Sequence, residues 1–171
     1  MEIRRLVRVA LLTALVAVAT LVLRVPMPAT EGYINVGDAI IVSGALLFGG
    51  VVAGVSGGLG SALADGLGGY AHWAPFTLII KGVEGLVIGI LCQWLKPDLN
   101  KQIGLMVAIG SASVGLFCMV TGYFVVELML YSLGPAMASL PGNFLQAGAS
   151  LVLGLLLMLA LRRSRFDLKR P

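Results

Sequence analysis

A chain of 171 residues, of which 58% are hydrophobic and only 12% are charged, is too apolar for an ordinary soluble domain, where about 25% of residues carry charge. The 12 lysines and arginines exceed the 8 aspartates and glutamates. They gather at the ends of apolar segments, however, which indicates membrane anchors and excludes a nucleic-acid-binding patch. The composition predicts an integral membrane protein with a single transmembrane domain over residues 1–171.

The apolar segments divide the chain into candidate transmembrane helices of ~20 residues each. Leu6–Leu23 is long enough, and is followed by enough further segments, to favour a first span over a signal peptide. Ile34–Ala64 is too long for one helix and short for two, and the pair Gly49-Gly50 offers a turn in its middle. Three further spans are expected at Ala74–Leu95, Ile103–Tyr131 and Phe144–Leu161.

The basic residues decide between five and six spans, because lysine and arginine concentrate in short cytoplasmic loops. Six spans with a cytoplasmic N-terminus leave only Arg24 at the outer edge and only Lys81 within a helix. The other ten basic residues then lie inside: Arg4, Arg5, Arg8, Lys96, Lys101, Arg162, Arg163, Arg165, Lys169 and Arg170. The sequence therefore predicts an all-α integral membrane protein with six transmembrane helices and cytoplasmic N- and C-termini.

The third span is rich in small residues, with Gly54, Gly58 and Ala62 at steps of four. Small residues at this spacing let helices approach closely in lipid, so a packing role is expected. The stretch GGLGSALADG lacks the Gly-Lys-Ser/Thr of a Walker motif, so no ATPase is expected in this chain. No metal-ligand spacing is present, and Cys92 and Cys118 are interpreted as reduced packing residues.

Polar residues within membrane helices are costly and suggest function. On three of the expected helices such residues recur at helical spacing and so share one face: Trp73, Thr77, Lys81 and Glu84 on the fourth, Tyr123, Glu127 and Tyr131 on the fifth, and Asn143, Gln146 and Ser150 on the sixth. The loop Val25–Gly37 adds Glu31, Tyr33 and Asn35. All three faces begin in the outer half of the membrane. They are expected to converge on an outward-facing pocket whose aromatic and hydrogen-bonding lining suits a small flat heterocycle.

The residues predicted to bind the substrate are Tyr33, Asn35, Trp73, Lys81, Glu84, Tyr123, Glu127, Asn143 and Gln146. Several of these positions also have a structural interpretation. Tyr33, Trp73 and Tyr131 could be aromatic residues of the membrane interface. Asn143 and Gln146 could serve only to tie the sixth helix to its neighbours.

Five of the ionisable residues raise separate expectations. Asp38 is expected to cap helix 2, Asp65 to be solvated at the end of helix 3, and His72 to be interfacial. Lys81 and Glu84 are i, i+3 neighbours that can pair. Because pairing rarely makes buried charge more favourable than apolar packing, the pair either forms the floor of the pocket or locks two helices together.

The segments YINVGDAII and GSALADGLGGYAHWAPFTLIIKGVEGLVIG resemble the substrate-binding S component of energy-coupling factor (ECF) vitamin transporters. The resemblance covers essentially the whole chain and lies closest to the hydroxymethylpyrimidine and riboflavin S components. It implies a six-helix protein in the cytoplasmic membrane of a prokaryote that captures a vitamin from outside. The loop between helices 1 and 2 covers the pocket in this family, which suits Val25–Gly37.

The resemblance also implies partners. An S component docks on a membrane-embedded T component driven by two ATPases, so ATP is used by the partners and no cofactor is expected in this chain. The family's Ala-x-x-x-Ala motif, which packs on the T component, matches Ala10 and Ala14. The sequence leaves three candidate substrates, of which hydroxymethylpyrimidine is favoured over pyridoxine and riboflavin. A solitary transporter without ATPases is the alternative class, and an enzyme is not expected because no serine–histidine arrangement is present.

Overall fold

The computed structural model describes residues 3–95, 97–99 and 101–164, and over these residues it contains six helices and one two-stranded hairpin. The elements in chain order are α1 (Ile3–Val22), β1 (Arg24–Met27), β2 (Gly32–Asn35), α2 (Gly37–Phe48), α3 (Gly50–Gly68), α4 (Ala74–Leu95), α5 (Gln102–Tyr131) and α6 (Leu133–Arg163). The prediction of six helices is confirmed, whereas the hairpin was not predicted.

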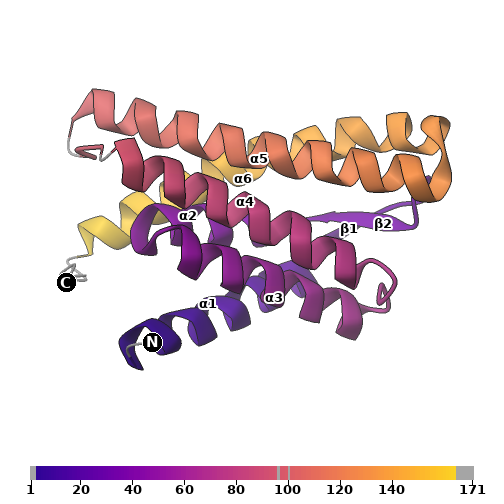
Figure 1. Ribbon diagram of the computed structural model, residues 1–171, viewed down its shortest axis with the longest axis horizontal. Coiled ribbons are helices and arrows are strands. Elements are labelled where there is room, and N and C mark those ends of the chain that lie inside the picture. The colour runs from indigo at the N-terminus through magenta and orange to yellow at the C-terminus, as the bar shows by residue number, and fades with distance from the viewer. Residues whose placement is uncertain (1–2, 96, 100, 165–171) are drawn as a thin grey trace.

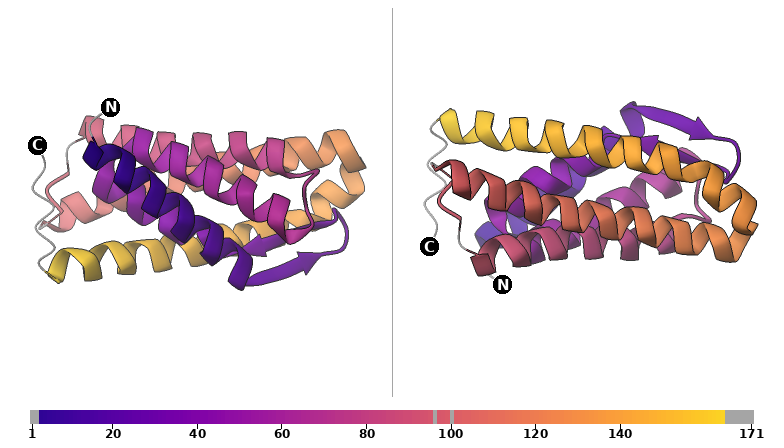
Figure 2. Two further views of the ribbon diagram at one scale, coloured as in Figure 1. Left: turned by 90° about the horizontal axis from the view of Figure 1, so that it is seen from below. Right: turned by 90° about the horizontal axis from the view of Figure 1, so that it is seen from above.

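The helices run back and forth between two ends of an elongated bundle (Figures 1 and 2). One end holds the start of α1, the turn between α2 and α3, and the C-terminal ends of α4 and α6; because Arg4, Arg5, Arg8, Arg162 and Arg163 belong to it, we call it the basic end. The opposite end, which we call the hairpin end, holds β1 and β2, the start of α4 and the turn between α5 and α6.

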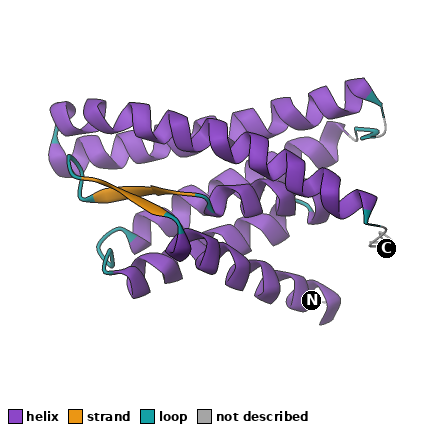
Figure 3. Ribbon diagram, turned by 180° about the vertical axis from the view of Figure 1, so that it is seen from behind, coloured by secondary structure: helices purple, strands orange, loops and turns teal. Residues whose placement is uncertain are grey.

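The connection from α1 to α2 is an antiparallel hairpin in which Arg24 pairs with Asn35 and Met27 with Gly32 (Figure 3). The turn contains Glu31 with φ of 49°, in the left-handed region. Gly142 of α6 lies so close that a Cβ atom there would stand 2.8 Å from the sulfur of Met27. The hairpin therefore packs directly on α6 and closes over the hairpin end of the bundle.

The break within Ile34–Ala64 lies where the sequence predicts it. α2 ends at Phe48, α3 begins at Gly50, and Gly49 between them has φ of 89°, a conformation that costs glycine little. Five of the helices are long and apolar enough to cross a membrane, whereas α2 has only 12 residues and a length of ~18 Å. The chain segment from the hairpin end to the basic end is longer than α2 itself, because it starts with β2, which directly precedes α2.

α3 packs closely on two neighbours through its small residues, as predicted. A Cβ atom on Gly54 would stand 2.8 Å from the carbonyl oxygen of Gly82 in α4, and one on Gly58 would stand 2.6 Å from that of Leu78. On another side of α3, a Cβ atom on Gly60 would stand 2.6 Å from the carbonyl oxygen of Thr13 in α1. Larger residues at these positions would push the helices apart.

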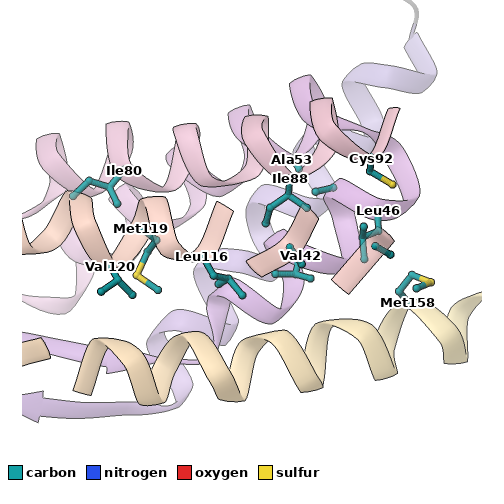
Figure 4. Close-up of a cluster of buried hydrophobic side chains, with 13 residues drawn as sticks. Val42, Leu46, Ala53, Ile80, Ile88, Cys92, Leu116, Met119, Val120 and Met158 are labelled. Atoms are coloured by element: carbon teal, nitrogen blue, oxygen red, sulfur yellow. The ribbon is translucent and has the colours of Figure 1, made fainter. Parts of the chain in front are cut away.

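The apolar core lies between α2, α3, α4, α5 and α6 toward the middle of the bundle (Figure 4). Val42, Ile88, Leu116, Met119 and Met158 are among its fully buried members. Because this core fills the centre, the polar pocket described below is confined to the hairpin end.

The start of the last helix corrects the sequence prediction, which placed it at Phe144. α6 begins at Leu133, directly after Ser132, whose φ of 78° makes the reversal from α5. Proline and glycine around Gly134 and Pro141 lower the hydropathy of this segment. Pro135 stands in the first turn, however, where a missing N–H costs little, and Pro141 is accommodated within the helix.

Candidate functional site

A small polar pocket lies at the hairpin end, under β2, and we call it the hairpin pocket. Its lining comes from the hairpin and from all the helices except α2: Thr20, Met27, Gly32, Tyr33, Asn35, Ser61, Asp65, Trp73, Thr77, Tyr123, Glu127 and Asn143. Its volume is about 20 Å³. Since one water molecule needs ~10–15 Å³ by this measure, the hairpin pocket as it stands is nearly filled by its own side chains.

Aromatic rings form one wall of the hairpin pocket. Trp73 is 4% exposed, and its ring centroid lies 5.9 Å from that of Tyr123 and 6.1 Å from that of Tyr131. His72, beside it, lies 3.5 Å from the Tyr131 hydroxyl and is exposed. Trp73 is therefore a buried member of an aromatic cluster rather than an aromatic residue at the membrane surface.

A buried carboxylate stands at another side of the pocket. Glu127 of α5 is 1% exposed, and Ser139 of α6 donates a hydrogen bond to its Oε2 atom. The side chains of Thr30 and Asn143 stand near the same carboxylate without completing well-formed hydrogen bonds to it. The described residues place no lysine or arginine against this carboxylate, so it retains the ability to accept hydrogen bonds from a ligand.

Three polar atoms of the pocket residues are buried and lack a hydrogen-bond partner. They are the donors Trp73 Nε1 and Asn143 Nδ2 and the acceptor Asp65 Oδ2; Asn143 stands near Glu127 and Asp65 near the Thr77 side chain, but neither contact completes a hydrogen bond of good geometry. Buried polar groups in folded proteins are nearly always paired, and an unpaired one costs roughly 1–3 kcal/mol. Three of them around one small pocket indicate a site that a polar ligand completes.

The position of Asp65 corrects the prediction that it is solvated. It is 2% exposed, and the Tyr33 hydroxyl donates to its Oδ1 atom at 2.5 Å. Burial, together with this hydrogen bond, raises the pKa of Tyr33 above its ordinary value, so the phenol keeps its proton at neutral pH. Arg24 lies over the Tyr33 and Tyr70 rings and donates to the Gly68 carbonyl, which fastens the hairpin to the end of α3.

The predicted pair of Lys81 and Glu84 is part of a larger group, which we call the ion cluster and define as Asp38, Lys81 and Glu84. Lys81 Nζ lies 2.5 Å from Asp38 Oδ1 and 3.3 Å from Glu84 Oε2, and all three side chains are at most 1% exposed. Neither oxygen of Glu84 makes a hydrogen bond of good geometry. The cluster joins α2 to α4 and does not line the hairpin pocket.

The prediction that Asp38 caps helix 2 is therefore wrong. The N-cap position is Val36, and Asp38 lies within the first turn with its carboxylate turned to Lys81. Its other oxygen, Oδ2, accepts a hydrogen bond of 2.6 Å from Gln146 Nε2. A buried ammonium group is a stronger partner for a carboxylate than a neutral backbone N–H, and the N–H of Gly37 already donates to the Asn35 side chain.

Gln146 connects the ion cluster to the hairpin. Its Oε1 atom accepts from the backbone N–H of Asn35 at 2.8 Å, while its amide nitrogen donates to Asp38. The Asn35 side chain in turn accepts from the Gly37 N–H at 2.8 Å and contacts Thr20. A continuous polar chain thus runs from the hairpin pocket's rim through α6 and α2 to α4.

Six of the nine residues predicted to bind a substrate line the hairpin pocket: Tyr33, Asn35, Trp73, Tyr123, Glu127 and Asn143. Lys81, Glu84 and Gln146 do not line it. They lie deeper along the same helix faces, where Lys81 and Gln146 contact Asp38 of α2 and Glu84 contacts Lys81. Of the two interpretations of the Lys81–Glu84 pair, the geometry favours the lock between helices.

Sequence reasoning also missed five lining residues: Thr20, Met27, Gly32, Ser61 and Asp65. Thr77, a further lining residue, stood on a predicted polar face but was not among the predicted binding residues. Thr20, Ser61 and Asp65 are polar residues near the ends of apolar helices, so their intramembrane polarity was the available signal. Met27 and Gly32 carry no such signal, because only the hairpin brings them over the pocket. The side chains of Ala10 and Ala14 are exposed on the outside of α1, away from the pocket.

Comparison with known proteins connects this architecture to transporters. Residues 1–163 match the model of the family described as "ECF-type riboflavin transporter, S component". The chain is 40% identical over 139 residues to a Pyrococcus woesei protein described as "Uncharacterized protein in gap 3'region", covering 81% of this chain and 88% of that one. It is 30% identical over 165 residues to the "Thiamine precursor transporter HmpT" of Lactococcus lactis subsp. cremoris (strain MG1363), covering 95% of this chain and 90% of the relative.

Proposed function

The chain belongs to the S-component family of ECF transporters, and from this premise we propose that it captures hydroxymethylpyrimidine in the hairpin pocket. As a family member it is the substrate-binding subunit of a transporter for a vitamin or vitamin precursor, and it is not an enzyme. The choice of substrate is supported by the relative named as a thiamine precursor transporter. The family description names riboflavin, which is the competing substrate.

The observation that carries the proposal is the set of unpaired polar atoms in the hairpin pocket. Trp73 Nε1 is a donor without an acceptor, and neither Asn143 Nδ2 nor Asp65 Oδ2 completes a well-formed hydrogen bond, although Glu127 and Thr77 stand near them. An aminopyrimidine with a hydroxymethyl group offers ring nitrogens and a hydroxyl oxygen to the donors, and amino and hydroxyl protons to Asp65 and Glu127. Its flat ring suits the aromatic wall around Trp73 and Tyr123.

The size of the hairpin pocket supports a small ring over a large one. With a volume of about 20 Å³, any ligand must displace side chains or the hairpin. The hairpin is held to α6 through Asn35 and Gln146 and to α3 through Tyr33 and Asp65. A single pyrimidine ring requires less of this displacement than the three fused rings and ribityl chain of riboflavin.

The proposed orientation puts the hairpin end outside and both chain termini in the cytoplasm. The start of α1 and the end of α6 lie at the same end, and that end carries Arg4, Arg5, Arg8, Arg162 and Arg163 among the described residues. Positive residues favour the cytoplasmic side. Six crossings follow, of which the short α2 makes the second. Lys96, Arg165, Lys169 and Arg170, which the prediction also places inside, lie outside the described residues.

The proposed partners are a T component and two ATPases that use ATP, in the cytoplasmic membrane of a prokaryote, and no cofactor is proposed for this chain. The T component would pack on α1 at Ala10 and Ala14, whose small exposed side chains allow close approach of another helix. Co-purification of this chain with those subunits would support the assignment. Uptake that needs no ATPase subunit would favour a solitary transporter.

Fluorescence of Trp73 tests the proposed substrate, because the only other tryptophan, Trp94, is 78% exposed at the basic end. The Trp94→Phe variant in detergent is titrated with hydroxymethylpyrimidine, pyridoxine, riboflavin, thiamine and biotin, with free tryptophan as the inner-filter control. Saturable quenching by hydroxymethylpyrimidine at submicromolar concentration is expected.

Two carboxylate variants of the Trp94→Phe protein locate the binding. Glu127→Gln is expected to weaken binding by roughly tenfold to a hundredfold, because charge-assisted hydrogen bonds contribute about 1.5–3 kcal/mol. Glu31→Gln makes the same change on the exposed hairpin turn and is expected to leave the affinity unchanged. Saturable quenching by riboflavin alone would identify riboflavin as the substrate in place of hydroxymethylpyrimidine. An equal loss of affinity in both variants would show that the ligand does not bind in the hairpin pocket.

A further inference from the structure

A second cavity opens at the basic end, on the opposite side of the membrane from the hairpin pocket in the proposed orientation. Its volume is about 400 Å³. Arg4, Arg5 and Arg8 of α1 line it together with Phe48, Gln93 and the first turn of α3. Nothing in the proposed capture of a vitamin uses these residues, so the cavity needs its own explanation.

The charge of this basic cavity is not balanced within the described part of the chain. None of the three guanidinium groups forms an ion pair with a described carboxylate. Arg8, which is half-buried, has its guanidinium 5.5 Å from the centre of the Phe48 ring, so it lies against the cavity wall. Three cations around one cavity repel each other until an anion enters between them.

Neutral donors add to this positive field. The N-cap of α3 is Gly49, which has no side chain to cap the free N–H groups of the first turn. Val51 and Val52, which follow it, line the cavity. The first turn of a 19-residue helix also carries the positive end of its dipole. The amide of Gln93 provides a further donor on the α4 side.

The remaining lining is apolar, and in the proposed orientation the cavity opens at the cytoplasmic end of the bundle. Phe48, Val51 and Val52 form this part, and Val51 is 48% exposed. Trp94, next to Gln93, is 78% exposed, as is typical of an interfacial aromatic residue. A free anion or an acidic protein segment would use the arginines but would leave the apolar surface uncovered, whereas a lipid has a phosphate and acyl chains side by side.

From the charge, the donors and the apolar lining together, we propose that the basic cavity binds the phosphate headgroup of an anionic lipid of the cytoplasmic leaflet. Basic pockets between transmembrane helices on this side of membranes commonly hold such headgroups. Arginine suits the role because its planar guanidinium group binds two phosphate oxygens at once. The bound lipid would hold α1 against the α2–α3 turn.

Native mass spectrometry of the full-length protein, released from nanodiscs with equal amounts of phosphatidylglycerol and phosphatidylcholine, tests the proposal. Phosphatidylglycerol is expected to remain bound in preference to phosphatidylcholine. The Arg8→Gln variant is expected to retain about fivefold less phosphatidylglycerol, since one basic residue near the surface contributes on that scale. Arg163→Gln removes a charge at the same end, outside the cavity, and is expected to retain it normally.

Three outcomes would overturn the proposal. Equal retention of the two lipids would exclude anion recognition, and an equal loss in Arg8→Gln and Arg163→Gln would indicate diffuse attraction without a site. Displacement of phosphatidylglycerol by submillimolar inorganic phosphate would assign the cavity to free phosphate. If Arg8→Gln does not fold, Arg4→Gln provides the same test, because Arg4 is exposed and its loss leaves the packing intact.

Discussion

Two groups of buried polar side chains stand out in the described part of the bundle, and they differ in whether the chain supplies an oppositely charged partner. In the ion cluster, Lys81 forms ion pairs with both Asp38 and Glu84. Gln146 of α6 donates a hydrogen bond to the other oxygen of Asp38. In the hairpin pocket, polar atoms of Trp73 and Asn143 have no partner. The two groups lie along the same helix faces, one deeper than the other.

This difference teaches how to separate structural from ligand-binding polarity in a membrane protein. Buried polar groups are costly unless they are hydrogen-bonded or paired. Where the chain itself supplies the partners, the group orients helices against each other. Where it does not, the cost is compensated only when a ligand arrives. The ion cluster should therefore respond to mutation in stability, and the hairpin pocket mainly in affinity.

The largest effect is expected from Lys81→Met. It leaves Asp38 buried without its counter-ion, and removing one partner of a buried pair costs about 3–5 kcal/mol. Thermal unfolding in detergent measures the loss. Lys101→Met, which removes an exposed lysine paired with Asp98, is the matched control and should cost at most about 1 kcal/mol. Equal melting temperatures for the two variants would show that the ion cluster does not hold the fold.

A smaller loss of stability is expected from Gln146→Leu. The change removes both the donor to Asp38 and the acceptor of the Asn35 N–H, and unpaired buried groups cost roughly 1–3 kcal/mol. The same thermal assay applies, with Gln102→Leu at the exposed start of α5 as the control. An unchanged melting temperature would mean that water replaces Gln146 and that the polar chain to the hairpin is not structural.

Asn143→Leu should separate stability from binding most clearly. Its Nδ2 atom has no partner, so an apolar replacement is expected to leave the unliganded protein as stable as before or more stable. Hydroxymethylpyrimidine should then bind about fivefold more weakly, for a lost hydrogen bond of about 1 kcal/mol. Melting curves with and without ligand measure both quantities. A clear loss of stability without ligand would place Asn143 with the structural group.

The smallest effect is expected from Tyr33→Phe, which removes the hydrogen bond from the hairpin to Asp65. A net contribution of about 1 kcal/mol is typical for such a bond. Hydrogen exchange of the hairpin amides should rise while the core amides stay protected, because only the cover of the pocket is loosened. Tyr70→Phe, on the neighbouring ring, is the control. Unchanged exchange at the hairpin would show that Asn35 and Gln146 hold it alone.

Much of the fold could be predicted from the sequence. Apolar segments together with the positions of the basic residues indicated six helices, and the small residues indicated the break at Gly49 and the close packing of α3, because each depends on local composition or on the absence of a side chain. The start of α6 was missed because Pro141 and nearby glycines look like a loop, although a helix packed on neighbours tolerates them. The hairpin was missed because RVPM and GYIN are too short to show alternation.

The candidate site was only partly predictable for a related reason. Helical periodicity states which residues share a face, so the amino-acid order alone is enough to assign Trp73, Glu127 and Asn143 to polar faces. It does not state which helix that face meets at each depth. Asp38 therefore looked like a cap and Asp65 like a solvated residue, although both are buried against partners on other elements.

By itself the sequence determined that this protein is a multi-helix membrane protein, where its main helices lie and which of their faces are polar, because hydrophobicity and helical period are local properties. Only the tertiary structure decided which polar residues satisfy one another. Lys81 finds its shortest contact 43 residues away at Asp38, and Gln146 lies 111 residues from Asn35. These distant contacts assign Lys81 and Gln146 to the structural group and not to the hairpin pocket. The sequence does not show them, because contacts between helices depend on how the helices pack and not on their order in the chain.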